Sequence, residues 1–270
     1  MANIQYLEQK AKNVRCNIIE MIGHGKAGHF GGSCSIADIA TALYFYKMNH
    51  NPKNPAMKGR DIFILSKGHS APAQYACLAE AGYFDKTELK NLKKLHTRLQ
   101  GHPDVRKLVG IEGNTGSLGQ GLSIAAGIAS AFKMDGINSK VYSVVGDGEL
   151  QEGQIWEAAM AASKFKLDNL VAIIDNNGLQ ATDFIDKSIG CNNIKGKFES
   201  FGWTVIECDG HNMKEIVEAL DKLDNLSGAP VAIIAHTVKG KGIACAENNP
   251  AFHNGTLTKE QYEQLMEVYQ

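Results

Sequence analysis

The sequence predicts a single α/β domain over residues 1–270, in which helices cover both faces of a mainly parallel sheet. Two observations predict this three-layer α/β/α arrangement. Short, continuously apolar runs at 141–145, 170–174 and 231–235 are typical of strands that are buried on both faces. Segments of helical length separate these runs, and no linker-like composition divides the chain.

The elements can be assigned in order along the chain. Residues 4–22 carry apolar side chains at helical spacing, which predicts an amphipathic helix. A glycine- and histidine-rich loop is expected over 23–33. The further expected elements are helix 36–47, strand 62–65, helices 71–82 and 87–95, a glycine-dense loop at 113–121, helix 122–132, strand 141–145, helix 155–165, strands 170–174 and 203–208, helix 213–223, strand 231–235 and a polar helix or docking segment at 257–270.

Composition excludes several classes of partner. The 28 basic and 29 acidic residues give a formal net charge of −1, so we expect no binding to nucleic acid or anionic lipid. None of the six cysteines forms a C-x-x-C pair, which disfavours a zinc site and fits reduced thiols. The N-terminus lacks the pattern of a signal peptide, and no apolar stretch reaches the roughly 20 residues of a membrane span. We therefore expect a cytoplasmic protein.

Polar residues follow two strands of the expected sheet. Gly146, Asp147 and Gly148 come after strand 141–145, and Asn177 comes after strand 170–174. The segment between them has the length of one crossover helix, so the two strands are expected to be neighbours. The carboxylate of Asp147 and the amide oxygen of Asn177 are hard donors, suited to Mg²⁺ or Ca²⁺. A diphosphate is a natural further ligand, and the two glycines allow its close approach.

Each motif alone is common in ordinary turns, and other nucleotide-binding motifs do not fit. Gln151 stands where a dinucleotide fingerprint needs its third glycine. The loop at 113–121 lacks the closing Lys-Ser or Lys-Thr pair of a Walker A loop. The pairing of both motifs across one β-α-β unit is what favours a functional site.

Residues 146–177, GDGELQEGQIWEAAMAASKFKLDNLVAIIDNN, resemble the thiamine diphosphate motif, and the interior ELQEG resembles that of transketolases in particular. Further blocks similar to those of transketolases occur in the same order, from about residue 10 to 255. They are GHFGG at 28–32, LSKGH at 65–69, GHP at 101–103 and TGSLGQG at 115–121. Such an ordered set is more specific than any single block.

The resemblance implies a role for each matching residue. Asp147 and Asn177 would bind Mg²⁺, or Ca²⁺ in its place, through side chains, and Leu179 through its carbonyl. Thiamine diphosphate would contact His69, Gly116, Ser117, Leu118, Gly146, Asp147, Gly148, Glu149, Asn177 and His253. The catalytic residues would be three histidines above the thiazolium ring and two glutamates that relay protons at a partner interface: His29, His69, His102, Glu152 and Glu157.

The sequence departs from the transketolase pattern at three places. Phe30 replaces a usual proline, residues 178–183 lack a usual Asp-Gly turn, and residues 252–255 replace a usual His-Gly pair around His253. Among the other histidines, His50, His96 and His211 are interpreted as surface residues. His24 is interpreted as a loop residue without a functional role, and His236 as a buried polar residue with its hydrogen bonds formed.

The resemblance implies transfer of a two-carbon ketol unit from a ketose phosphate such as xylulose 5-phosphate to an aldose such as ribose 5-phosphate, as in the pentose phosphate pathway. Complete transketolases also contain a pyrimidine-binding half, and nothing in 1–270 resembles it. We therefore expect a natural subunit of a split enzyme rather than a truncated chain. A C-terminal partner subunit would complete the site, in a heterotetramer with two copies of each chain.

Three alternatives stay open at this point. The first is the alpha subunit of a 2-oxo-acid dehydrogenase, which shares the paired motif and a two-chain architecture. The second is a transketolase for an unusual sugar, such as a sulfonated or branched ketose. The third is a scaffold subunit that binds the cofactor without catalysing turnover; the retained histidines argue against it.

Overall fold

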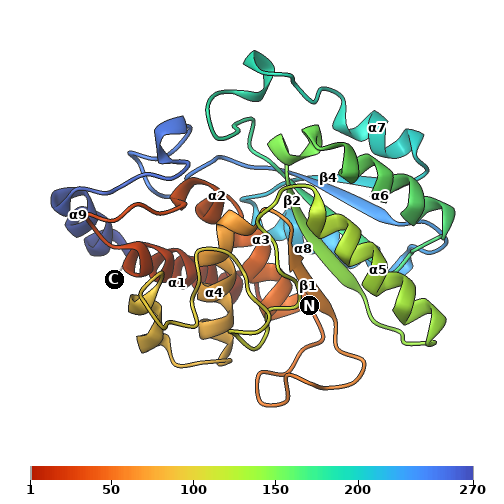
Figure 1. The fold of residues 1–270 in the computed structure, drawn as a ribbon, viewed down its shortest axis with the longest axis horizontal. Helices are drawn as coiled ribbons and strands as arrows, with labels where there is room; N and C mark the ends of the chain where they lie inside the picture. The colour runs from red at the N-terminus through yellow and green to blue at the C-terminus, as the bar shows by residue number, and fades with distance from the viewer. Residues whose placement is uncertain (1, 270) are drawn as a thin grey trace.

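A five-stranded sheet runs through the centre of the molecule (Figure 1), and the computed structural model describes residues 2–269. The strand order is β1-β2-β3-β5-β4, and every neighbouring pair is parallel. The strands are β1 (Ile62–Leu65), β2 (Val141–Gly146), β3 (Leu170–Asn176), β4 (Thr204–Asp209) and β5 (Val231–His236). The expected parallel α/β sheet is therefore confirmed.

Helices cover both faces of this sheet. The first face carries α1 (Ile4–Ile22), α2 (Phe30–Ser35), α3 (Ala37–Ala42), α4 (Ala71–Ala81), α8 (Met213–Lys222) and α9 (Lys259–Tyr269). The second carries α5 (Gln120–Met134), α6 (Gly153–Lys164) and α7 (Ile194–Ser200). Because successive strand side chains point to opposite faces, Phe63 and Tyr142 join the first core while Ile64 and Val145 join the second. Figure 1 shows α5 and α6 across the sheet from α1 and α4.

The first histidine-rich segment differs from expectation. The sequence predicts a loop up to residue 33, but α2 begins at Phe30. Phe30 and Cys34 lie four residues apart on one helical face and are both fully buried in the first core. Their packing outweighs the low helix propensity of Gly31 and Gly32. The expected helix 36–47 is likewise divided into α3 and a single π-helical turn, Leu43–Lys47.

The expected helix 87–95 is wrong. Only a 3₁₀ helix, Lys86–Asn91, forms there. Lys93 and His96 have φ values of 59° and 62°, a left-handed conformation that no right-handed helix contains. Further 3₁₀ turns occur at Gly68–Ser70, Gly148–Gln151, Ile185–Lys187, Leu223–Asn225 and Pro250–Phe252.

The expected polar helix near the C-terminus is confirmed as α9, which packs beside α1 (Figure 1). Tyr262 and Leu265 cover part of the first core, and the Tyr269 hydroxyl donates a hydrogen bond to the Gly242 carbonyl at 3.1 Å. Across residues 2–269, no helix combines the length and apolar character needed to cross a membrane.

Candidate active site

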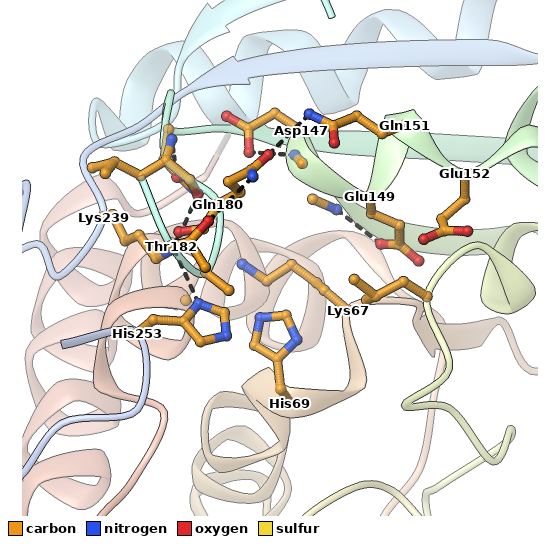
Figure 2. Close-up of a pocket in the computed structure, with 17 residues that line it drawn as sticks. Lys67, His69, Asp147, Glu149, Gln151, Glu152, Gln180, Thr182, Lys239 and His253 are labelled. Carbon is orange, nitrogen blue, oxygen red and sulfur yellow. Dashed lines mark hydrogen bonds between the residues drawn. The ribbon is translucent and has the colours of Figure 1, made fainter. Parts of the chain in front are cut away.

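The paired motif lies at the carboxyl ends of two adjacent strands. Gly146 is the register partner of Asp175, and the Asp147 amide donates to the Asp175 carbonyl at 3.2 Å. The expectation that these two strands are neighbours is confirmed. A cavity of about 310 Å³ opens at this point (Figure 2). The cavity is lined by ten of the residues predicted above: His69, Leu118, Gly146, Asp147, Gly148, Glu149, Glu152, Asn177, Leu179 and His253.

Asp147 is a buried carboxylate that lacks a full set of compensating charges. One oxygen accepts the Gly148 N–H at 2.8 Å, and the other accepts the Gly178 N–H at 2.5 Å. Burial, followed by repulsion from Asp175, raises the pKa of Asp147 to about 7. A cation at this carboxylate would relieve both effects.

Asn177 and Leu179 add oxygen atoms to the same cavity. The Asn177 amide nitrogen donates to Asp175 Oδ2 at 2.9 Å, which fixes which end of the amide is the oxygen. That oxygen accepts the Leu179 N–H at 3.1 Å. A carboxylate, an amide and a carbonyl form the kind of donor set that Mg²⁺ shares with phosphate oxygens and water. The roles of these residues as metal ligands stay a prediction.

The oxygen donors of Asp147, Asn177 and Leu179 differ from the clusters of His and Cys side chains that usually bind transition metals. In residues 2–269, no group of three or more His, Cys, Asp or Glu side chains is placed to hold a metal ion. Two side chains and one carbonyl leave the octahedron of Mg²⁺ incomplete, so the chain needs a ligand with its own oxygens.

Two lysines provide positive charge beside the cavity, and neither is among the residues predicted from the sequence. Lys67 is 2% exposed and forms an ion pair with the fully buried Asp175. Burial opposes ionisation of Asp175, but Lys67 and its hydrogen bonds hold the pKa of that carboxyl below its usual value. The signal for Lys67 lies inside the LSKGH block itself, two residues before His69.

Lys239 is the second cation. Its ammonium group donates to the carbonyls of Leu179 at 3.0 Å and Gln180 at 2.9 Å, and lies 3.1 Å from His253 Nδ1. Burial, followed by the charge of Lys67, lowers the pKa of Lys239 to about 8. Figure 2 shows both lysines directed toward the cavity that Asp147 lines. Lys67 is already paired with Asp175, so Lys239 is the group whose charge a bound diphosphate would neutralise.

The predicted histidines gather at one side of the cavity. The ring of His29 lies 5.3 Å from that of His69, 6.2 Å from that of His102 and 5.4 Å from that of His253, between centroids. His69 and His253 are 4.9 Å apart, and these two line the cavity. Gly116 is close by, since a Cβ there would lie 2.9 Å from His102 Cδ2.

These rings are neutral near pH 7. Burial, with smaller contributions from Lys67 and the neighbouring histidines, lowers the pKa of His69 to about 2. Burial lowers the pKa of His29 and of His253 to about 4, with the charges of His253 and Lys239 respectively as the next causes. A neutral imidazole can both donate and accept a hydrogen bond, so this group can exchange protons with hydroxyls and carbonyls.

Glu149 connects the glycine loop to the sheet. Its buried carboxylate accepts the Ser66 hydroxyl, the Gly119 N–H at 2.8 Å and the Gly146 N–H at 3.0 Å. These bonds join the ends of β1 and β2 to the loop that carries Ser117. Burial raises the pKa of Glu149. Glu149 therefore shapes the cavity wall, and its contact with a cofactor stays a prediction.

The remaining predicted residues lie apart from the cavity. Ser117 is exposed on the glycine loop. Glu157 lines a separate groove of about 390 Å³ between α5 and α6. By contrast, Glu152, the N-cap residue of α6, lines the cavity. The structure thus brings Glu152 to the cavity and leaves Glu157 outside it.

Two histidines differ from their interpretation. His211, predicted to be a surface residue, has a side chain only 12% exposed and bonds Asp38 at 2.8 Å. His236, predicted to be a core residue, is exposed at the end of β5, where it contacts Glu207 at 3.1 Å. His50 is half-buried against the Tyr83 hydroxyl at 3.0 Å, and of the three predicted surface histidines only His96 is exposed.

The residues present fit thiamine diphosphate bound with Mg²⁺. The under-compensated carboxylate of Asp147 fits a bound cation, and the ammonium group of Lys239, whose polar contacts are two carbonyls and His253, fits a bound anion. The cavity wall at Gly32 is closely packed, because a Cβ there would lie 2.6 Å from the Ser70 hydroxyl and 3.2 Å from the Lys67 ammonium. A Cβ on Gly148 would meet Gln180 at 3.0 Å, so a side chain at this position would crowd the cavity wall.

Comparison with known proteins identifies the family. The family described as "Transketolase, thiamine diphosphate binding domain" matches residues 7–270. The chain is 43% identical over 257 residues to the 6-deoxy-6-sulfo-D-fructose transketolase subunit SqwG of Clostridium sp. strain MSTE9, over 95% of this chain and 94% of that protein. It is 40% identical over 263 residues to one of the subunits of the apulose-4-phosphate transketolase of Phocaeicola vulgatus, over 97% of this chain and 93% of that one.

A solved structure agrees. Transketolase from Campylobacter jejuni superposes with a TM-score of 0.91 and 34% identity, over 99% of this chain but only 43% of that one. The chain therefore spans less than half of this solved transketolase and almost the whole length of the two named subunits. The fold, the cavity and these matches together show that the chain belongs to the transketolase family and corresponds to its thiamine diphosphate binding domain.

Proposed function

We propose that the chain is the thiamine diphosphate- and Mg²⁺-binding subunit of a two-chain transketolase, which transfers a two-carbon ketol unit from a ketose donor to an aldose acceptor. The observation that carries the proposal is the cavity at the ends of β2 and β3. One side of it presents the oxygens of Asp147, Asn177 and Leu179, and two lysines stand beside them. The 2-oxo-acid dehydrogenase alternative loses its support, because the match is to transketolases.

Thiamine diphosphate, when bound, supplies the electron sink that ketol transfer requires. The residues of this chain would do the rest of the work on this side. Asp147 and Asn177 would hold the metal, and two lysines, Lys67 and Lys239, would balance the charge of the diphosphate. The neutral rings of two histidines that line the cavity would exchange protons with the sugar's hydroxyl and carbonyl groups.

The partner is proposed to be a C-terminal transketolase subunit. Two relatives are named as subunits, and the solved transketolase is more than twice as long as the part this chain covers. We propose that the partner packs on the side that carries the α5–α6 groove and brings the pyrimidine-binding half of the site. Glu152 and Glu157 would then lie at the interface, in a heterotetramer with two copies of each chain.

The donor is proposed to be an unusual ketose. The two relatives are named for 6-deoxy-6-sulfo-D-fructose and for apulose 4-phosphate, so their names favour a sulfonated or branched sugar. This support replaces the first expectation of xylulose 5-phosphate and the pentose phosphate pathway, which neither of these two names favours. The tail of the sugar would be read mainly by the partner.

The test is turnover by the two chains together. The chain and the product of the neighbouring reading frame are purified separately and mixed with Mg²⁺, thiamine diphosphate and ribose 5-phosphate. Donors are 6-deoxy-6-sulfo-D-fructose, apulose 4-phosphate and xylulose 5-phosphate. We expect ketol transfer only in the mixture, and faster from one of the first two donors. Full activity of the chain alone contradicts the two-chain proposal, and preference for xylulose 5-phosphate contradicts the proposed donor.

A further inference from the structure

Arg15, Asp38 and His211 form a buried polar cluster outside the lining of the cavity. The two terminal nitrogens of Arg15 donate to the two carboxylate oxygens of Asp38 at 2.8 and 2.6 Å. His211 Nδ1 lies 2.8 Å from Asp38 Oδ2. The side chains are only 9–12% exposed. Three polar groups so far from water need a complete set of partners, which here come from α1, α3 and the turn before α8.

The bonds of His211 determine its tautomer. The Val238 N–H, which can only donate, points at His211 Nε2 at 2.8 Å. Nε2 must therefore be unprotonated, and the ring proton must sit on Nδ1, where it is donated to Asp38. Asp38 in this way aims the lone pair of His211 at the backbone of the residue that precedes Lys239.

Arg15 holds the other side of Lys239. Its Nε donates to the Lys241 carbonyl at 3.2 Å, and one terminal nitrogen also donates to the Cys34 carbonyl at 3.3 Å. Between these points, the Gly240 N–H donates to the Gly31 carbonyl at 3.0 Å. The backbone after Lys239 is thereby tied to α1 and α2, and the backbone before it is tied to His211, although the segment itself belongs to no helix or strand.

Lys239 is the only side chain in this segment, residues 238–241, that lines the cavity. Its ammonium group bridges the carbonyls of Leu179 and Gln180, beside the proposed metal donors. The position of this ammonium group depends on the position of the Lys239 backbone, because a lysine side chain is flexible and cannot fix its own end.

We propose that Arg15, Asp38 and His211 form a positioning network that sets the backbone of Lys239, so that its ammonium group meets the diphosphate side of the cavity. The inference rests on the proposed function, because it assigns the network an effect on thiamine diphosphate binding. The three residues are positioning residues: none of them lines the cavity, and each acts through the segment that carries Lys239.

A double-mutant cycle tests the inference, since residues that act through one another are not additive. The variants are His211→Leu, His211→Gln, Lys239→Met and the double change His211→Leu with Lys239→Met. Gln can still accept from Val238, so it is the conservative variant. The measurement is the Kd of thiamine diphosphate at saturating Mg²⁺, by calorimetry on the full chain with its partner subunit, together with the Kd of thiamine monophosphate.

We expect His211→Leu to weaken thiamine diphosphate binding about tenfold and His211→Gln to restore most of the loss. The preference for the diphosphate over the monophosphate should shrink in parallel. In the Lys239→Met background, His211→Leu should change the Kd by less than about twofold. Lys47→Met, which breaks an ion pair with Asp224 far from the cavity, is the control for a general loss of stability and should leave the Kd unchanged.

Two results would overturn the inference: tight binding retained by both His211 variants, or losses that multiply in the double variant. Where the leucine variant does not fold, the glutamine variant is combined with Lys239→Met and read in the same way. A wild-type complex that fails to bind thiamine diphosphate at all would instead refute the proposed function, so the two failures are distinguishable.

Discussion

At the scale of single residues, the chain itself neutralises only one of the two buried carboxylates Asp147 and Asp175. Asp175 is neutralised by Lys67, whereas Asp147 has only backbone N–H partners. The difference explains why the pKa of Asp175 is lowered while burial and Asp175 itself raise the pKa of Asp147 to about 7. A cation bound at Asp147 would therefore stabilise its ionised form.

Asp147→Asn should remove this dependence. We expect Mg²⁺-dependent affinity for thiamine diphosphate to fall at least ~10-fold, because an amide oxygen is a weaker ligand for Mg²⁺ than a carboxylate. Calorimetry at varied Mg²⁺ checks the result. Asp186→Asn, which changes an exposed acidic residue after β3, is the matched control. Unchanged affinity in the Asp147 variant would exclude it as a metal ligand.

The histidine cluster makes a prediction about pH. The unfolded chain takes up a proton at His69 near pH 6.5, whereas burial keeps the folded chain from doing so until about pH 2. The free energy of unfolding therefore falls as the pH drops below 6.5, by up to about 1.4 kcal/mol per pH unit for one such group. His69→Gln should make the fall between pH 6.5 and 4.5 shallower.

Urea unfolding at a series of pH values measures this slope. His96→Gln, which changes an exposed histidine, serves as the comparison and should keep the wild-type slope. Identical slopes in all three proteins would show that His69 is not held neutral in the folded state.

At the scale of elements, the glycine loop and α5 are packed against the end of β1 without space to spare. A Cβ on Gly121, in the first turn of α5, would lie 2.5 Å from Ser66 Cα. Gly127, further along the same helix, has nothing within 4 Å of such a Cβ. The close contact with Ser66 therefore requires glycine at position 121, whereas no contact within this chain requires it at position 127.

Alanine at these two positions should have opposite effects. Gly121→Ala should lower the free energy of unfolding by about 1–3 kcal/mol, because the contact with backbone cannot relax cheaply. Gly127→Ala should raise it by about 0.5–1 kcal/mol, because alanine restricts the unfolded chain and favours the helix. Urea denaturation of both variants checks the signs, and a stabilised Gly121 variant would contradict the close packing.

Much of this element-level description could be predicted from the sequence. The predicted bounds of β2, β3 and β5 agree to within two residues, because continuous apolar runs between helical segments have few other solutions. The topology alone then puts Asp147 and Asn177 at one edge. The contacts of Lys67 with Asp175 and of Lys239 with Leu179 could not be predicted, since they join residues far apart in the chain through packing alone.

At the scale of the whole molecule, the proposed partner surface is the open side of α5 and α6. The groove between these helices is lined by small side chains, among them Ala126 and Gly127 from α5 and Ala161 from α6. Phe165, which also lines the groove, is 64% exposed. A face of small and apolar side chains suits a tightly packed subunit contact.

Ala161→Arg should block this contact while leaving the fold intact. We expect loss of the two-chain complex in size-exclusion chromatography and a drop in turnover of at least ~100-fold, because a charged side chain would be buried without a partner. Ser227→Arg, on an exposed loop before β5, is the matched control and should assemble normally. Normal assembly of the Ala161 variant would move the interface elsewhere.

The order of strands also has a consequence during biosynthesis. β1 is an edge strand that pairs with β2, and its first residue, Ile62, lies opposite Val141, which is far along the chain. While a ribosome makes the segment between them, the apolar run Ile62–Leu65 has no neighbour to complete its hydrogen bonds. Nascent chains would therefore depend on holding chaperones until β2 emerges, because an unpaired apolar strand is prone to aggregate during that interval.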